Sequence, residues 1–186
     1  RLKQEILLGM GGIRLLNALG VSTDLYHINE GHAALINVER LANLVNKKFN
    51  FSEALEVVRA TSLFTTHTPV PAGHDAFDED MLRVYLRHVP DKLKITWEEF
   101  MDLGRDYSAH EEEFSMSVLA AKTSGEMNGV SKLHGLVTRK MFCNLWHGYF
   151  PDELHIGYVT NGVHYGTWTA SEWQDFYKEM FGNNFL

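Results

Sequence analysis

Two histidines, a carboxylate and several hydroxyl groups lie together in residues 65–75, the stretch of this chain best suited to chemistry. An apolar run over residues 60–64 precedes them and predicts a short buried strand. Pro69 and Pro71 fix their own φ angles, remove two backbone donors and keep the residues before them extended. Because a helix cannot pass through this segment, we predict a stiff loop at a strand end, where α/β proteins usually place ligand-contacting groups.

Two other interpretations of this loop remain open. It could be a rigid proline turn that carries only a solvated pair, His74 and Asp75. A metal site built from these two residues with His27 and His67 is also possible, because imidazole and carboxylate groups are common metal ligands. No spacing among them demands such a site, and His27 and His32 would point to opposite sides of a strand. We therefore predict no metal.

A second candidate site is the sequence H-I-N-E-G-H over residues 27–32, which lies at a predicted strand-to-helix corner. Glu30 and Gly31 would begin the helix, and backbone donors at such a start favour an anion or a sugar hydroxyl. The alternative is that His32 packs in the core and Glu30 is a favourable charge at the helix N-terminus. The motif alone does not decide between the two.

Two glycine-containing segments also allow more than one interpretation. Asn128 and Gly129 permit a positive φ and enter a helix, which predicts either a polar-ligand contact or a simple kink between packed helices. Residues 9–12 (G-M-G-G) lack the preceding strand and the third glycine of a dinucleotide loop, since Arg14 occupies that position. We interpret these glycines as small residues that let another element approach closely.

Hydrophobic periodicity predicts a helix-rich α/β domain. Strands are expected over residues 21–28, 60–64 and 154–160, and helices over 2–19, 33–49 and 53–58, the last capped by Ser52. Thr96 with Glu99, and Thr169 with Glu172, fit capping boxes that would open two more helices. Residues 115–146 read as two helical pieces broken near residues 125–129. Strands that alternate with helices favour an open sheet.

Composition excludes several classes of protein. The 186 residues are 45% hydrophobic and 22% charged, which is typical of a globular domain. A net charge of -7 argues against a nucleic-acid binder, and no apolar run approaches the ~20 residues that span a membrane. The single cysteine, Cys143, fits a cytoplasmic protein. The start at Arg1, without methionine, predicts a piece of a longer polypeptide.

Taken together, five segments resemble the α-glucan (glycogen, starch or maltodextrin) phosphorylases. Their amino-acid sequences are most similar to those of the bacterial and archaeal branch. Their family counterparts are R-L/I-K-Q-E, N-D-T-H-P-A-L, N-H-T-V-L-P, N-G-V-A-R-I-H and T-N-G-I. In this chain they correspond in order to residues 1–5, 29–35, 66–71, 128–134 and 160–163. The matching segments span most of the sequence.

The resemblance implies a specific function. The family has two Rossmann-like domains facing across a cleft, a two-domain glycosyltransferase (GT-B) architecture, and residues 1–186 would be the later part of the N-terminal catalytic domain. The reaction transfers a terminal α-1,4-linked glucosyl unit to inorganic phosphate, giving glucose 1-phosphate, with pyridoxal phosphate in the full-length parent. His67 would be the catalytic residue that contacts the sugar, with its backbone carbonyl near developing positive charge. Glu30, His32 and Asn128 would contribute to substrate binding, and Asn161 to the cleft wall.

Departures from the family pattern limit what this chain can do. Compared with the family motifs, Glu30 replaces Asp, Gly31 replaces Thr and Thr66 replaces Asn. Ala72 and Gly73 occupy a position that is acidic in the animal enzymes. The family's cofactor-lysine segment and its E-A-S-G-T-G-N-M motif are absent. We therefore expect no cofactor on this chain, no activity without the missing C-terminal domain, and possible self-association. The alternatives are a non-catalytic α-glucan-binding module and half of a nucleotide-sugar glycosyltransferase.

Overall fold

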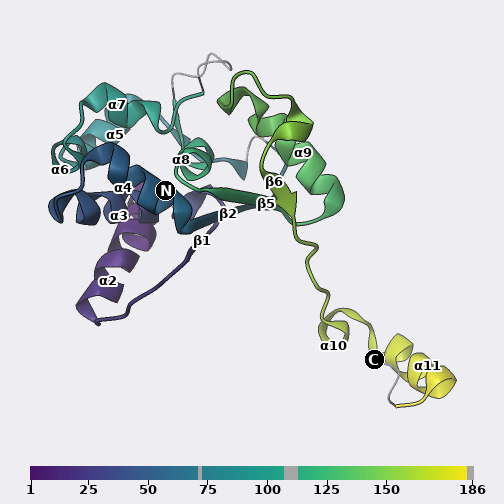
Figure 1. Ribbon diagram of the computed structural model, residues 1–186. Helices are drawn as coiled ribbons and strands as arrows, with labels where there is room; N and C mark the ends of the chain where they lie inside the picture. Colours follow the sequence, from purple (N-terminus) through teal and green to yellow (C-terminus); the bar gives the residue numbers. More distant parts are fainter. Residues whose placement is uncertain (71–72, 107–112, 184–186) are drawn as a thin grey trace.

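A four-stranded parallel sheet organises the protein. The computed structural model describes residues 1–70, 73–106 and 113–183, so that Pro71 and Ala72 lie outside the described residues. The strands lie in the order β1-β2-β5-β6 (Figure 1). Their bounds are Tyr26–Asn29, Ser62–Thr66, Glu126–Gly129 and Ile156–Tyr158. The helix-rich α/β class is thus confirmed, with all strand pairs of this sheet parallel.

An apolar row crosses the sheet and forms the centre of the core. The strand register aligns Ile28 with Phe64, Phe64 with Met127 and Met127 with Ile156, and all four are buried. Aligned residues of neighbouring strands point to one face. On that face Phe142 at the end of helix α9 contacts Phe64 edge to face, with ring centroids 6.2 Å apart.

Helices of five or more residues provide most of the remaining structure. They are α1 (Leu2–Ile6), η1 (Leu7–Gly11), α2 (Gly12–Ala18), α3 (Leu35–Asn46), α4 (Phe51–Ala60), α5 (Glu79–Leu86), α6 (Val89–Leu93), α7 (Trp97–Asp102), α8 (Met116–Lys122), α9 (Lys132–Phe142) and α11 (Ser171–Phe181). Shorter elements are η2 (Gly31–Ala33), η4 (Cys143–Leu145), η5 (Pro151–Glu153), α10 (Tyr165–Trp168), and the antiparallel pair β3 (Ala76–Phe77) and β4 (Phe114–Ser115).

The prediction of a close approach at the N-terminal glycines is confirmed for Gly9 alone, because a Cβ at Gly12 would meet nothing within 4 Å. Residues 2–18 form one continuous helical run, with a π-helical turn η1 between α1 and α2. A Cβ atom at Gly9 would lie 2.8 Å from both the backbone nitrogen of Ile36 and the Cβ of Leu35. This separation is too short for real side chains, so the glycine is what lets this helix pack against α3.

Several predicted boundaries are wrong. The first strand begins only at Tyr26, not at residue 21. The predicted helix break near residues 125–129 is the strand β5, which pairs with both β2 and β6. Thr169 opens no helix, because α11 begins after Ala170 and has no side-chain cap. The capping box of Thr96 and Glu99 is confirmed.

The cap of helix α4 also differs from the prediction. Asn50, not Ser52, accepts a hydrogen bond from the Glu53 backbone N–H at 2.9 Å, and the Glu53 carboxylate accepts one from the Asn50 backbone N–H. The Asn50→Ala variant should therefore lose about 1 kcal/mol of unfolding free energy, the usual contribution of an N-cap. Urea unfolding measures this loss. Ser52→Ala is the matched control, and an equal loss in both variants would contradict the assignment.

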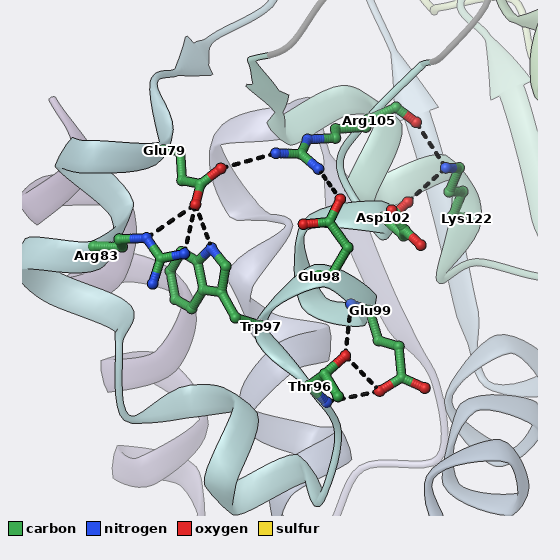
Figure 2. Close-up of polar contacts among 9 residues, drawn as sticks. All are labelled: Glu79, Arg83, Thr96, Trp97, Glu98, Glu99, Asp102, Arg105 and Lys122. Carbon is green, nitrogen blue, oxygen red and sulfur yellow. Dashed lines mark hydrogen bonds and ion pairs between the residues drawn. The ribbon is translucent and has the colours of Figure 1, made fainter.

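A polar network joins the helical layer to α8 (Figure 2). The Glu79 carboxylate accepts hydrogen bonds from Arg83 and from Arg105, the latter at 2.9 Å. The Lys122 ammonium donates to the backbone carbonyls of Asp102 and Arg105, at 2.6 and 2.7 Å. Burial of the Lys122 side chain lowers the pKa of its ammonium group. The network thereby fixes the position of α8 beside the sheet.

The C-terminal residues extend away from the sheet (Figure 1). Helices α10 and α11 contribute no buried residue to the core. Their aromatic side chains are largely exposed, with 77% of Trp168 and 56% of Trp173 accessible. The described part of the chain has no helix with both the length and the apolar character needed to cross a membrane.

Candidate functional site

A row of polar side chains lies one residue beyond the apolar row, near the carboxyl edge of the sheet. The register aligns Asn29 with Thr65 and Thr65 with Asn128. Because side chains alternate along a strand, this row points to the face opposite Phe64. The carboxyl edge of a parallel sheet is where α/β proteins bind ligands. The fold therefore brings three of the sequence-predicted motifs to one edge.

Direct hydrogen bonds connect this polar row. The Thr65 hydroxyl donates to Asn128 Oδ1 at 2.8 Å, and Thr65 is buried. His27 Nε2 lies 2.7 Å from the same hydroxyl oxygen. Since that hydroxyl donates its only proton to Asn128, the imidazole nitrogen is the donor to Thr65. Thr65 thus links the amide of Asn128 to His27, a function that the sequence did not indicate.

His67 follows β2 directly and contacts the end of β1. Its Nε2 forms a hydrogen bond with Asn29 Oδ1. Its backbone N–H donates to Glu30 Oε1, which also accepts the backbone N–H of Thr68 at 3.2 Å. The His67 imidazole is exposed. Hydrogen bonds therefore bring His67 together with Asn29 and Glu30, and these three residues form the centre of the candidate site.

The far side of the loop is held by His74. Its Nε2 lies 3.2 Å from the Thr68 carbonyl, and its Nδ1 lies 2.6 Å from Ser117 Oγ on α8. A carbonyl only accepts, so Nε2 carries the proton and Nδ1 of the neutral ring accepts from the serine hydroxyl. A serine–histidine pair can activate a nucleophile. Here only 2% of Ser117 is exposed, so the pair serves to hold the loop.

An acidic pair, buried Glu5 and half-buried Asp75, lies at the end of the loop. The Arg1 guanidinium donates to Asp75 Oδ2 at 2.7 and 3.1 Å and lies 3.4 Å from Glu5 Oε1. The side chain of Glu5 is only 3% exposed. Burial, followed by the neighbouring carboxylate of Asp75, raises the pKa of Glu5 to about 7, although Arg1 opposes this shift. Glu5 is therefore largely protonated below neutral pH.

The remaining predicted site residues lie close to this cluster. His32 is half-buried in η2, two residues after Glu30. Asn161 is exposed beyond β6, and its backbone N–H donates to the Val130 carbonyl at 3.2 Å. Asn128 is buried and reaches the cluster through Thr65. Asn128 therefore lies on the strand next to β2, whereas Asn161 follows the more distant strand β6.

The metal alternative has no support in the geometry. His27 binds Thr65, His67 binds Asn29, His74 binds Ser117, and Asp75 binds Arg1. Within residues 1–70, 73–106 and 113–183, no three histidine, cysteine or acidic side chains are grouped closely enough to hold a metal ion. Amides, imidazoles and a carboxylate are groups that exchange hydrogen bonds with neutral hydroxyls. The site is suited to a polyhydroxylated ligand.

Comparison with known proteins gives a consistent result. Residues 21–185 match the family model described as carbohydrate phosphorylase. The chain is 47% identical to the maltodextrin phosphorylase of Thermococcus litoralis over 176 residues, which are 92% of this chain and 20% of that protein.

Two further relatives match the chain from end to end. It is 39% identical to the glycogen phosphorylase of Mycobacterium tuberculosis, covering 100% of this chain and 23% of that protein. It is 34% identical to the glycogen phosphorylase of Aquifex aeolicus, with 100% and 26% covered. The chain thus spans a fifth to a quarter of the length of these relatives.

Proposed function

This chain belongs to the carbohydrate phosphorylase family, and from that premise we propose that it forms one wall of the glucosyl site of a cytoplasmic α-glucan phosphorylase. The complete enzyme would transfer the terminal α-1,4-linked glucosyl unit of a glucan to inorganic phosphate, giving glucose 1-phosphate. Residues 1–186 would be the later part of the N-terminal catalytic domain in a GT-B architecture. The chain matches only 20–26% of each relative, so these relatives contain further parts that it lacks, and we assign the C-terminal domain to them.

The observation that carries this proposal is the cluster of His67, Asn29 and Glu30 at the carboxyl edge of the sheet. We assign His67 to the sugar, because its imidazole is exposed while its ring is oriented by Asn29. Glu30 and His32 would line the side of the site that faces the glucan chain, and Asn128 would complete the substrate-binding wall. A fixed carbonyl dipole at His67 would stabilise positive charge that develops at the sugar only in the transition state.

The described residues do not fit pyridoxal phosphate, the cofactor implied by the family. Its attachment requires a lysine directed into an enclosed site. Lys122 is the one described lysine that is not exposed, and its ammonium is occupied by two backbone carbonyls. The cofactor would therefore be held by the rest of the polypeptide, and this chain contributes sugar contacts. Alone, it would be inactive and would self-associate through exposed aromatic surfaces such as that of α11.

The proposal is tested by phosphate-dependent release of glucose 1-phosphate from maltoheptaose. A longer polypeptide that contains this segment, supplied with pyridoxal phosphate, should be active, whereas the 186-residue chain should not. An inactive longer polypeptide would overturn the proposal, and maltoheptaose binding without turnover would then favour a glucan-binding module. Turnover by the short chain would contradict our assignment of the cofactor to the missing part.

In the complete enzyme, His67→Ala should lower kcat/KM by about 10- to 100-fold, the loss expected when one good hydrogen bond to the sugar is removed. Steady-state phosphorolysis kinetics measure the effect. His147→Ala is the matched control, because His147 is exposed and follows η4. Equal rates in the His67 variant and the wild type would exclude His67 from the sugar site.

A further inference from the structure

We propose that Glu30, assisted by the His74–Ser117 pair, is a positioning residue that fixes the peptide backbone of His67 and Thr68. Among the described residues, the His67 carbonyl is then the one backbone acceptor of these two residues without a donor. We call this set of hydrogen bonds the clamp, and its role in catalysis rests on the proposed function. The clamp itself is a property of the fold and can be tested without substrate.

The backbone of Glu30 is strained. Its φ and ψ angles are 70° and 166°, a region that is populated almost entirely by glycine. The next residue, Gly31, packs closely against α8, since a Cβ there would lie 2.7 Å from Ser117 Oγ. A glycine at position 30 would adopt these angles freely. Backbone stability therefore does not explain why a glutamate occupies this position.

The side chain of Glu30 has a second unfavourable feature. Its Oε2 atom is buried and has no hydrogen-bond partner among the described residues. Leaving a buried polar atom without a partner destabilises a fold. Strain and a partly unsatisfied carboxylate persist together only where the surrounding structure enforces them, as at functional sites. The benefit must come from the other oxygen, Oε1.

Glu30 Oε1 holds the start of the loop from its N–H side. It accepts the backbone N–H groups of both His67 and Thr68. Hydrogen bonds to a carboxylate are stronger than those between neutral groups. Two adjacent N–H groups directed at one oxygen fix the orientation of the peptide planes that contain them.

His74 holds the same segment from the carbonyl side. Its Nε2–H donates to the Thr68 carbonyl, and Ser117 on α8 fixes its ring through Nδ1. Asn29 fixes the side chain of His67. Within the part of the chain that the structure describes, no donor reaches the His67 carbonyl. Every other polar group of these two residues' backbones is occupied, so that carbonyl remains available to a ligand.

The first test separates positioning from stability. Glu30→Gly removes both the strain and the clamp. In the 186-residue chain, we expect its urea midpoint to be equal to or above that of the wild type, while the His67 and Thr68 amides exchange at least tenfold faster with deuterium. Intrinsic exchange at these amides is set by residues 66–68, so the substitution at position 30 does not change it directly. A lower midpoint, or unchanged exchange, would overturn the proposal.

Lys48→Gly provides the matched control, because Lys48 is also a non-glycine residue at positive φ, 82°, and lies after α3. It should relieve strain without altering exchange at His67 and Thr68; acceleration there would show that the effect is general loosening and overturn the proposal. Glu30→Gln keeps an acceptor oxygen, so it should accelerate exchange less than Glu30→Gly does. Equal acceleration by both would also count against the clamp.

A second test connects the clamp to catalysis in the complete enzyme. Glu30→Gly should reduce kcat at least tenfold and change KM less, because the loop no longer holds the carbonyl in its transition-state position. An unchanged kcat would overturn the catalytic part of the inference. If the wild-type enzyme showed no phosphorolysis, the proposed function would fail, whereas the exchange result would still decide the clamp.

Discussion

At pH 8, replacing Glu5 with glutamine should raise the free energy of unfolding by about 3 kcal/mol. At pH 4 the same substitution should change it little. The folded protein holds the pKa of Glu5 at about 7, against an ordinary value of 4.5, because the side chain is buried beside Asp75. A carboxyl group with a raised pKa stabilises the fold while it is protonated in both states. That contribution is lost as pH rises through the folded value, since ionisation then occurs more readily in the unfolded chain.

Glutamine imitates the protonated acid and cannot ionise, so Glu5→Gln should escape this loss between pH 4.5 and about 7. Urea unfolding at pH 4, 6 and 8 measures the difference. Glu126→Gln is the control, because Glu126 is exposed at the start of β5 and should give a nearly constant difference. A Glu5 variant whose stability followed that of the wild type at every pH would show that the pKa of Glu5 is not raised by its burial.

Gly9→Ala should lower the free energy of unfolding by about 2 to 3 kcal/mol, although alanine is the better helix former. The new methyl group would lie 2.8 Å from the Ile36 backbone and from the Leu35 side chain. Relieving that overlap requires the N-terminal helix and α3 to separate. The loss of close packing should outweigh the gain of up to about 1 kcal/mol in helix propensity.

Gly12 offers a control within the same helical run. A Cβ at Gly12 would meet nothing within 4 Å, so Gly12→Ala should stabilise the protein by about 0.5 to 1 kcal/mol. Thermal or urea unfolding of both variants gives the comparison. Stabilisation by both substitutions would mean that Gly9 is not needed for the contact with α3.

Strong periodic patterns were sufficient to predict some elements and insufficient for others. Ala34, Val38, Leu41 and Val45 recur at helical spacing within the predicted helix over residues 33–49, and all four are buried, Ala34 as the N-cap of α3. Strand β5 has the sequence E-M-N-G, whose asparagine and glycine are uncommon in strands. It is a strand because β2 and β6 pair with it on both sides. Such tertiary pairing cannot be seen in a four-residue pattern.

The candidate site was predictable in its parts and not in its connections. The strand-end pattern identified the loop of His67 and the corner of Glu30, but it did not indicate that one residue holds the other's backbone. The sequence pattern assigns Thr65 to the loop hydroxyl groups, but Thr65 is a buried residue of β2, which extends to Thr66. Its role depends on register, which aligns it with Asn29 and Asn128.

The parallel arrangement of the sheet has a consequence for folding kinetics. The bond between His67 and Asn29 joins residues 38 positions apart, and the bond between Thr65 and Asn128 joins residues 63 positions apart. Contacts between such distant residues form slowly, because long loops must close before any contact compensates for the lost entropy. Helices such as α3 can form locally and early. The polar edge of the sheet should therefore be among the last regions to mature, and a partly folded chain could be largely helical while lacking its site.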